Sequence, residues 1–181
     1  MWWIILAVVV VLILFVITTY NSLVVLRNKV KDQWAQIDVQ LKRRCDLIPN
    51  LVETVKGYAK HESKTLEDVI KARNSVLNAK NTKDEMNASN EMSASLTKLF
   101  ALAESYPELK ANENFVSLQE SLKETEDKIS YARQFYNDNV MNYKNKLEVF
   151  PSNVIASMFN FKPEPFFEAT SEERKNVEVK F

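Results

Sequence analysis

The residues that could do catalytic or metal chemistry are few in this sequence, and their spacing does not suit that chemistry. The one histidine, His61, is followed by Glu62 as in the HExxH motif of zinc proteases, but Thr65 stands where the second histidine should be. A single histidine also excludes a ferritin-like di-iron site, which needs two Glu-x-x-His pairs. We therefore expect no catalytic residue, no metal ligand and no bound cofactor.

Cys45, the one cysteine, is the remaining candidate nucleophile. It precedes His61 by 16 residues. That separation is about 24 Å along a helix, so a Cys–His pair would need a sharp fold-back of the chain. Cys45 also lies on an apolar stripe, where a small buried side chain is the simpler interpretation. We expect a buried thiol in a protein that is not an enzyme.

The composition excludes several other classes of function. The chain has 181 residues and one glycine, Gly57, whereas the Rossmann fingerprint and the P-loop each need several glycines. It holds 24 basic and 24 acidic residues, so it lacks the excess of positive charge that is typical of a protein that binds nucleic acid. Few glycines and many charges indicate an all-α chain.

The N-terminus is predicted to be a transmembrane anchor over residues 1–20. Residues 2–17 are unbroken apolar, the first charge is Arg27, and about 20 residues of helix span the hydrocarbon core of a bilayer. A cleaved signal peptide is the alternative, but the chain has no basic N-terminal region and no A-x-A cleavage site. The lipid bilayer is thus the first expected partner, through residues 2–20.

The charges that flank this segment predict its orientation. Arg27, Lys29 and Lys31 follow it, and no basic side chain precedes it. Because basic flanks stay in the cytoplasm, we expect Met1 outside the cell and the rest of the chain in the cytoplasm.

Residues 21–151 are predicted to form an antiparallel bundle of about four long helices. The first carries an apolar stripe with a period of 3.6 residues, and we expect it to kink at Pro49, a full break being the alternative. The stripe consists of Leu23, Leu26, Val30, Trp34, Ile37, Leu41, Cys45, Ile48, Val52, Val55 and Ala59.

The other helices follow from shorter patterns. A second helix is expected from a Ser63 N-cap to about Lys80, with Leu66, Val69, Ile70, Val76 and Leu77 turned inward. Residues 80–91 are polar and read as a loop or a frayed break, and a third helix is expected over about 84–105. A fourth runs from near Asn112 to Pro151, with an apolar period close to the 3.5 of a coiled coil from Phe115 to Phe150.

Residues 152–181 differ in composition and form a separate C-terminal segment. Residues 152–158 could form a short helix, and Lys162-Pro163-Glu164-Pro165 favours an extended backbone. The segment has five phenylalanines, which are too many for a solvated tail: Phe159, Phe161, Phe166, Phe167 and Phe181. We therefore expect part of it to dock on the bundle and the stretch near 168–176 to be mobile.

Several blocks of this sequence closely resemble the LemA family. They are Tyr20–Val24, Trp34–Val52, Val55–Glu62, Ala72-Arg73, Tyr106–Ala111, Arg133-x-x-Tyr136-Asn137 and Phe150-Pro151-x-Asn153. The sequence departs from the usual pattern at Lys144, where asparagine is usual, and at Asn160, where glycine is usual. The resemblance implies a bacterial single-pass membrane protein with an antiparallel helical bundle and no established enzymatic activity.

Two classes of function remain open. The first is a membrane-tethered scaffold or adaptor for other envelope proteins, and a membrane protease is one candidate partner that the resemblance suggests. The second is an enzyme or small-ligand module with a polar pocket near Pro49, built from Arg44, Asn50 and His61. The basic triplet Lys42-Arg43-Arg44 is expected to be a solvated face or a partner-binding patch.

Overall fold

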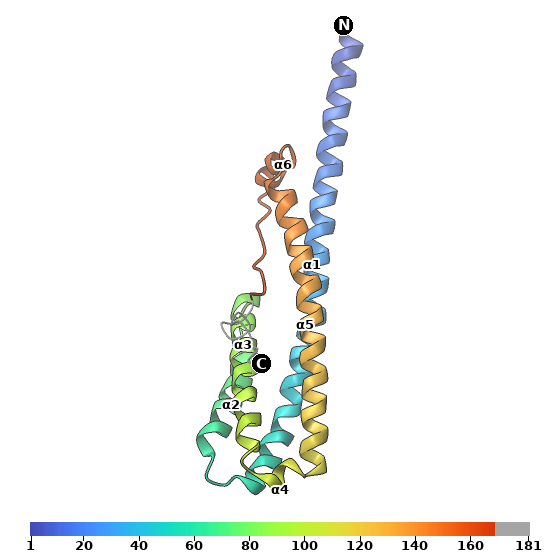
Figure 1. Ribbon diagram of the computed structural model, residues 1–181. Helices are drawn as coiled ribbons and strands as arrows, with labels where there is room; N and C mark the ends of the chain where they lie inside the picture. The colour runs from blue at the N-terminus through green and yellow to red at the C-terminus, as the bar shows by residue number, and fades with distance from the viewer. Residues whose placement is uncertain (169–181) are drawn as a thin grey trace, which may run out of the picture. The chain divides into compact units, whose positions relative to one another are not determined.

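The computed structural model describes residues 1–168, and within this range the chain consists of helices and connecting segments, without a strand (Figure 1). The all-α prediction is therefore confirmed. The helices are α1 (Trp2–Tyr58), α2 (Ser63–Leu77), α3 (Thr82–Ala103), α4 (Pro107–Lys110), α5 (Glu113–Glu148) and α6 (Ser152–Met158).

The chain divides into two compact units. The first combines Met1–Gln36 with Ala132–Phe166, so it holds the first part of α1, the end of α5 and α6. In it α5 runs antiparallel to α1 (Figure 1), and the rings of Trp34 and Tyr136 meet edge to face at 5.4 Å. The second unit is Ile37–Tyr131 with the described residues Phe167 and Glu168, and in it α2 packs against α3.

The apolar stripe of α1 is its buried face, as its period predicts. Leu26 and Trp34 are half-buried, and the other members are buried: Leu23, Val30, Ile37, Leu41, Cys45, Ile48, Val52, Val55 and Ala59. The helix continues through Pro49, so the alternative of a full break is wrong.

The start and the phase of α2 differ from the prediction. Ser63 is its first helical residue, and the N-cap is Glu62, which makes no capping hydrogen bond through its side chain. Ile70 and Leu77 are exposed, whereas Ala72 is buried. The buried positions are three or four residues apart and form one narrow face, and the two larger aliphatic side chains fall outside it.

The third predicted helix, over about 84–105, is α3, and it begins at Thr82, so most of the stretch 80–91 is helix rather than a loop or a frayed break. Asn81 is the N-cap of α3, and its side chain accepts a 2.9 Å hydrogen bond from the amide of Asp84. Asp84 and Glu85 place negative charge at the positive end of the helix dipole, where it is stabilising. Met86 and Met92 supply the buried face, so capping and burial together outweigh the polar composition.

The fourth predicted helix is α5, preceded by the short α4 that the sequence did not reveal. Asn112 caps α5 by accepting a 3.0 Å hydrogen bond from the amide of Phe115. The helix ends at Glu148, so Phe150 lies beyond it and is 77% exposed, and its assignment to the buried stripe is wrong. The coiled-coil interpretation of α5 stays a prediction.

The short helix α6 matches the expectation for residues 152–158 and ends in a left-handed residue. Asn160 has φ of 55°, the amide of Phe161 bonds to the carbonyl of Ala156, and the amide of Asn160 bonds to that of Ser157. These are the two hydrogen bonds of a Schellman cap, whose left-handed position favours glycine and then asparagine. Phe167 is buried, whereas the predicted mobility beyond Glu168 and the docking of Phe181 lie outside the described residues.

Candidate functional site

The most extensive exposed apolar surface belongs to the first turns of α1. Nearly every side chain from Trp2 to Leu14 is exposed, and the large ones keep between 45% and 85% of their surface accessible. Within the described residues, α1 is the one helix long and apolar enough to cross a membrane. A core helix of a soluble protein with this composition would be mostly buried, so the exposure argues against that alternative, whereas a signal sequence near the N-terminus would share these properties.

A polar cluster around Arg44 lies in the second unit. Arg44 is completely buried, and its Nη1 lies 2.5 Å from Glu126 Oε2 of α5 and 2.9 Å from Ser93 Oγ of α3. Its Nη2 donates to Ser89 twice, to Oγ at 2.7 Å and to the carbonyl oxygen at 3.1 Å. One guanidinium therefore joins α1, α3 and α5 by charge-assisted hydrogen bonds.

The burial of Arg44 corrects the interpretation of the basic triplet. The side chains of Lys42 and Arg43 are solvated, with exposures of 69% and 45%, but Arg44 belongs to the core. A signal for this was present, because position 44 lies three residues after Leu41 and four before Ile48, on the buried side of the same helix.

A second arginine meets α1 at the turn that proline disturbs. Pro49 has no amide hydrogen, so the carbonyl of Cys45 lacks the donor that a regular helix would supply. Arg73 of α2 fills this gap, because its Nε donates a 2.9 Å hydrogen bond to the Cys45 carbonyl oxygen. The proline and the arginine are therefore parts of one contact between α1 and α2.

The candidate nucleophile does not have the surroundings of a reactive thiol. Cys45 is completely buried, as expected, and desolvation raises the pKa of its thiol against the opposing charges of Arg44 and Arg73. His61 is exposed and lies beyond the end of α1, so the two residues do not form a pair. A raised pKa keeps the thiol protonated and unreactive.

The pocket expected near Pro49 is not built from the three residues named for it. Arg44 is turned into the core and bonded to α3 and α5, whereas Asn50 and His61 are exposed. Among the described residues, no group of three His, Cys, Asp or Glu side chains could hold a metal ion.

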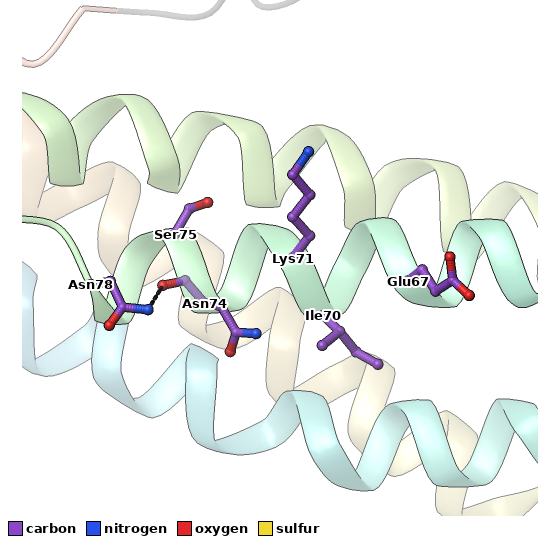
Figure 2. Close-up of a pocket in the computed structure, with 6 residues that line it drawn as sticks. All are labelled: Glu67, Ile70, Lys71, Asn74, Ser75 and Asn78. Carbon is purple, nitrogen blue, oxygen red and sulfur yellow. Dashed lines mark hydrogen bonds between the residues drawn. The ribbon is translucent and has the colours of Figure 1, made fainter.

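A shallow hollow of about 430 Å³ lies along α2 (Figure 2). One helix supplies all of its lining, which consists of Glu67, Ile70, Lys71, Asn74, Ser75 and Asn78. Asn78 Nδ2 donates a 2.7 Å hydrogen bond to the carbonyl of Asn74, within the same helix. Since no other element contributes a residue to this lining, the hollow is a surface feature without convergent chemistry.

Comparison with known proteins assigns the family. The model of the LemA family matches residues 33–181, and so begins after the apolar segment. Protein LemA of Metamycoplasma hominis is 22% identical over 160 residues, which cover 88% of this chain and 73% of that protein. A match over so much of the chain shows that this helical protein belongs to the LemA family.

Proposed function

We propose that this protein is a single-pass, membrane-anchored scaffold or adaptor whose helical bundle binds other envelope proteins. The observation that carries the proposal is α1 itself, which presents an exposed apolar surface from Trp2 and a buried stripe from Leu23 within one helix. A membrane-tethered bundle requires a helix whose one end exposes apolar side chains to lipid and whose other end packs in the bundle.

The proposed orientation places Met1 outside the cell and the bundle in the cytoplasm. Arg27, Lys29 and Lys31 follow the apolar segment, and no charged side chain precedes it. Basic residues close to the end of a transmembrane helix are retained on the cytoplasmic side.

Exposed apolar side chains on the bundle are the proposed contacts for a protein partner. In the second unit Val39 is 62% exposed and Tyr131 is 68% exposed. Aromatic side chains are enriched among the residues that carry most of the binding energy at protein interfaces. An integral envelope protein, such as a membrane protease, is the proposed class of partner.

The alternative of an enzyme or small-ligand module loses its main support. It needed Arg44 free to meet a ligand, but every assigned contact of its guanidinium is made within the bundle. We therefore propose no catalytic role for this chain.

Photo-crosslinking in native membranes tests the adaptor role. A photoreactive amino acid at Val39 or Tyr131 of the full chain should give a reproducible protein adduct, identified by mass spectrometry. The same group at Glu120, which is exposed and polar, is the matched control. Equal adduct patterns at all three positions would contradict a specific partner.

Cysteine labelling tests the anchor and its orientation. A cysteine at Trp2 should react with an impermeant maleimide added to intact cells, whereas one at the exposed Lys162 should react only after lysis. The native Cys45 is buried and gives little background. The opposite pattern would reverse the orientation, and extraction of the chain by alkaline carbonate would contradict the anchor.

A further inference from the structure

The end of α5 and the short α6 expose an unusual set of large apolar side chains. We call this set the α5–α6 corner; it consists of Val149, Phe150, Val154, Met158 and Phe159, with exposures of 59%, 77%, 49%, 69% and 48%. Soluble proteins rarely gather exposed apolar side chains in this way unless something covers them.

Aromatic contacts fix this corner to the end of the apolar segment of α1, within the first unit. The ring of Tyr20 meets the ring of Phe159 at 4.8 Å and that of Phe161 at 5.6 Å, in both cases edge to face. Figure 1 shows α6 following the end of α5, alongside α1. If residues 2–20 cross the bilayer, Tyr20 lies at its boundary, and Phe159 lies there with it.

A groove is lined jointly by α1 and by residues of the α5–α6 corner. It has a volume of about 500 Å³, and Phe15 and Thr19 of α1 line it together with Val149, Phe150 and Pro151. Phe15 precedes Tyr20 by five residues, which is about 7.5 Å along the helix towards the bilayer centre. The α1 residues that line the groove run from Phe15 to Leu26, so Val149 and Phe150 lie beside the stretch of α1 in which the anchor ends.

The polar lining of the groove suits the same location. Asn142, Asn145 and Lys146 also line it, as do Ser22, Leu26 and Ser152. A lysine at the edge of a bilayer extends its ammonium group towards the headgroups while its aliphatic stem stays in apolar surroundings. Amide groups can bind the phosphate and ester oxygens of the same headgroups.

We propose that the α5–α6 corner is a second membrane contact, inserted into the headgroup region of the leaflet that receives Tyr20. Its seven-residue helix is too short to span a bilayer, but its exposed apolar side can lie in the interface. Lipid is the occupant because the corner is continuous with the exposed apolar surface of α1 through Phe15 and Tyr20. The inference rests on the membrane anchor of the proposed function.

Fluorescence quenching in the full chain tests it. Single cysteines at Phe150, Val154 or Met158 are labelled with an environment-sensitive dye, and the protein is reconstituted in vesicles of equal parts phosphatidylcholine and phosphatidylglycerol. Each label should shift its emission to the blue and lose intensity when the vesicles carry lipid with a doxyl group near the headgroup. A label at Phe135, an exposed aromatic position further back on α5, should respond instead to aqueous iodide.

A label at Leu12, near the middle of residues 2–20, separates the two proposals, and for this label the lipid carries its doxyl group deep in the acyl chain. If it is quenched by doxyl lipid while the corner labels respond only to iodide, the corner is solvated and the inference is overturned, but the anchor stands. If the corner labels are shielded from both quenchers, protein rather than lipid covers them, and the inference is equally overturned. If Leu12 is not quenched by doxyl lipid, the anchor itself is wrong, and this inference is lost with it.

Discussion

Arg73 donates its Nε hydrogen to the carbonyl oxygen of Cys45 at 2.9 Å, and this is the oxygen that an amide at position 49 would otherwise bind. The presence of a proline in α1 and that of an arginine in α2 are thus linked through one acceptor. Substitutions of Pro49 and Arg73 should therefore change the free energy of unfolding in a way that is not additive, because both act on the same acceptor.

A double-mutant cycle tests this link. Arg73→Met should destabilise the protein by about 1 kcal/mol, because the Cys45 carbonyl loses its donor. In a Pro49→Ala background the same change should cost less, because the introduced alanine brings its own amide to that carbonyl. Chemical denaturation in detergent micelles, followed by circular dichroism, measures all four free energies of unfolding; equal costs of Arg73→Met in both backgrounds would refute the link.

The same proline substitution separates packing from recognition. We expect Pro49→Ala to act on stability, because the proline serves the contact between α1 and α2. Unchanged unfolding of Pro49→Ala together with the loss of one specific crosslink in membranes would instead assign Pro49 to a partner groove.

Removing the carboxylate of Glu126 should lower the stability of the protein more than removing the guanidinium of Arg44. Glu126→Ala leaves a charged, buried arginine without its counter-charge, which should cost about 3 kcal/mol. Arg44→Met keeps the length of the side chain and leaves a glutamate whose side chain is 38% exposed and can turn to water, so it should cost about 1–2 kcal/mol.

Glu124→Ala is the matched control for the Arg44 cluster. Glu124 lies on the same helix and pairs with Lys128 at 2.6 Å and Arg43 at 3.5 Å, but all three side chains are about half exposed. Exposed ion pairs contribute little, so this change should leave unfolding unchanged. The reverse order of Glu126→Ala and Arg44→Met in denaturation experiments would contradict the proposed energetics.

Because Asn160 has a left-handed backbone conformation, glycine and alanine at this position should change the stability of the protein in opposite directions. Asn160→Gly should stabilise the protein by up to about 1 kcal/mol, since glycine adopts positive φ without steric cost. Asn160→Ala should destabilise it by about 1 kcal/mol, since a Cβ without a local hydrogen bond is unfavourable there. Equal unfolding free energies of the two variants would show that the cap does not control the end of α6.

Tyr136 predicts a loss of stability at alkaline pH. Burial, followed by the negative charge of Glu164, raises the pKa of its phenol, whose hydroxyl donates a 2.8 Å hydrogen bond to the carbonyl of Pro165. Above pH of about 10 the unfolded chain releases this proton before the folded protein does, so the contribution is complete below that pH and declines above it.

Denaturation at several pH values measures this effect. Tyr136→Phe should cost about 1 kcal/mol at neutral pH, the worth of the hydrogen bond, and its deficit against the parent should shrink above pH of about 10. Tyr131→Phe, at a position that is 68% exposed, is the matched control and should follow the parent at every pH. A deficit of Tyr136→Phe that stays constant into the alkaline range would refute the assignment.

The regular parts of this fold could be predicted because they follow one repeated physical pattern. The period of the apolar residues located the buried face of α1, and continuity of that period across Pro49 indicated one helix. The ends of helices were harder, because they depend on single contacts. The Asn81 cap of α3 overrode a polar composition, and the end of α5 before Phe150 turned an apolar residue outward.

The polar contacts could be predicted less well than the apolar core. Pro49 indicated which carbonyl would lack a donor, but only the packing of α2 against α1 shows that Arg73 supplies one. Arg44 stood in a run of charges that is typical of a surface, and its burial depends on groups 45 to 82 residues away in the chain. The helical period placed position 44 on the buried side of α1, but it did not indicate these distant partners.

The position of Glu126 also discriminates among alternative alignments of the bundle. Apolar stripes repeat at every turn, so a slide of α5 along its neighbours by one turn, about 5.4 Å, would still bring apolar residues to the core. The positions one turn away from Glu126 are Leu122 and Ser130, and neither carries a negative charge. Every such shifted alignment would bury Arg44 without a counter-charge, so a single acidic residue selects one register where hydrophobic packing alone allows several.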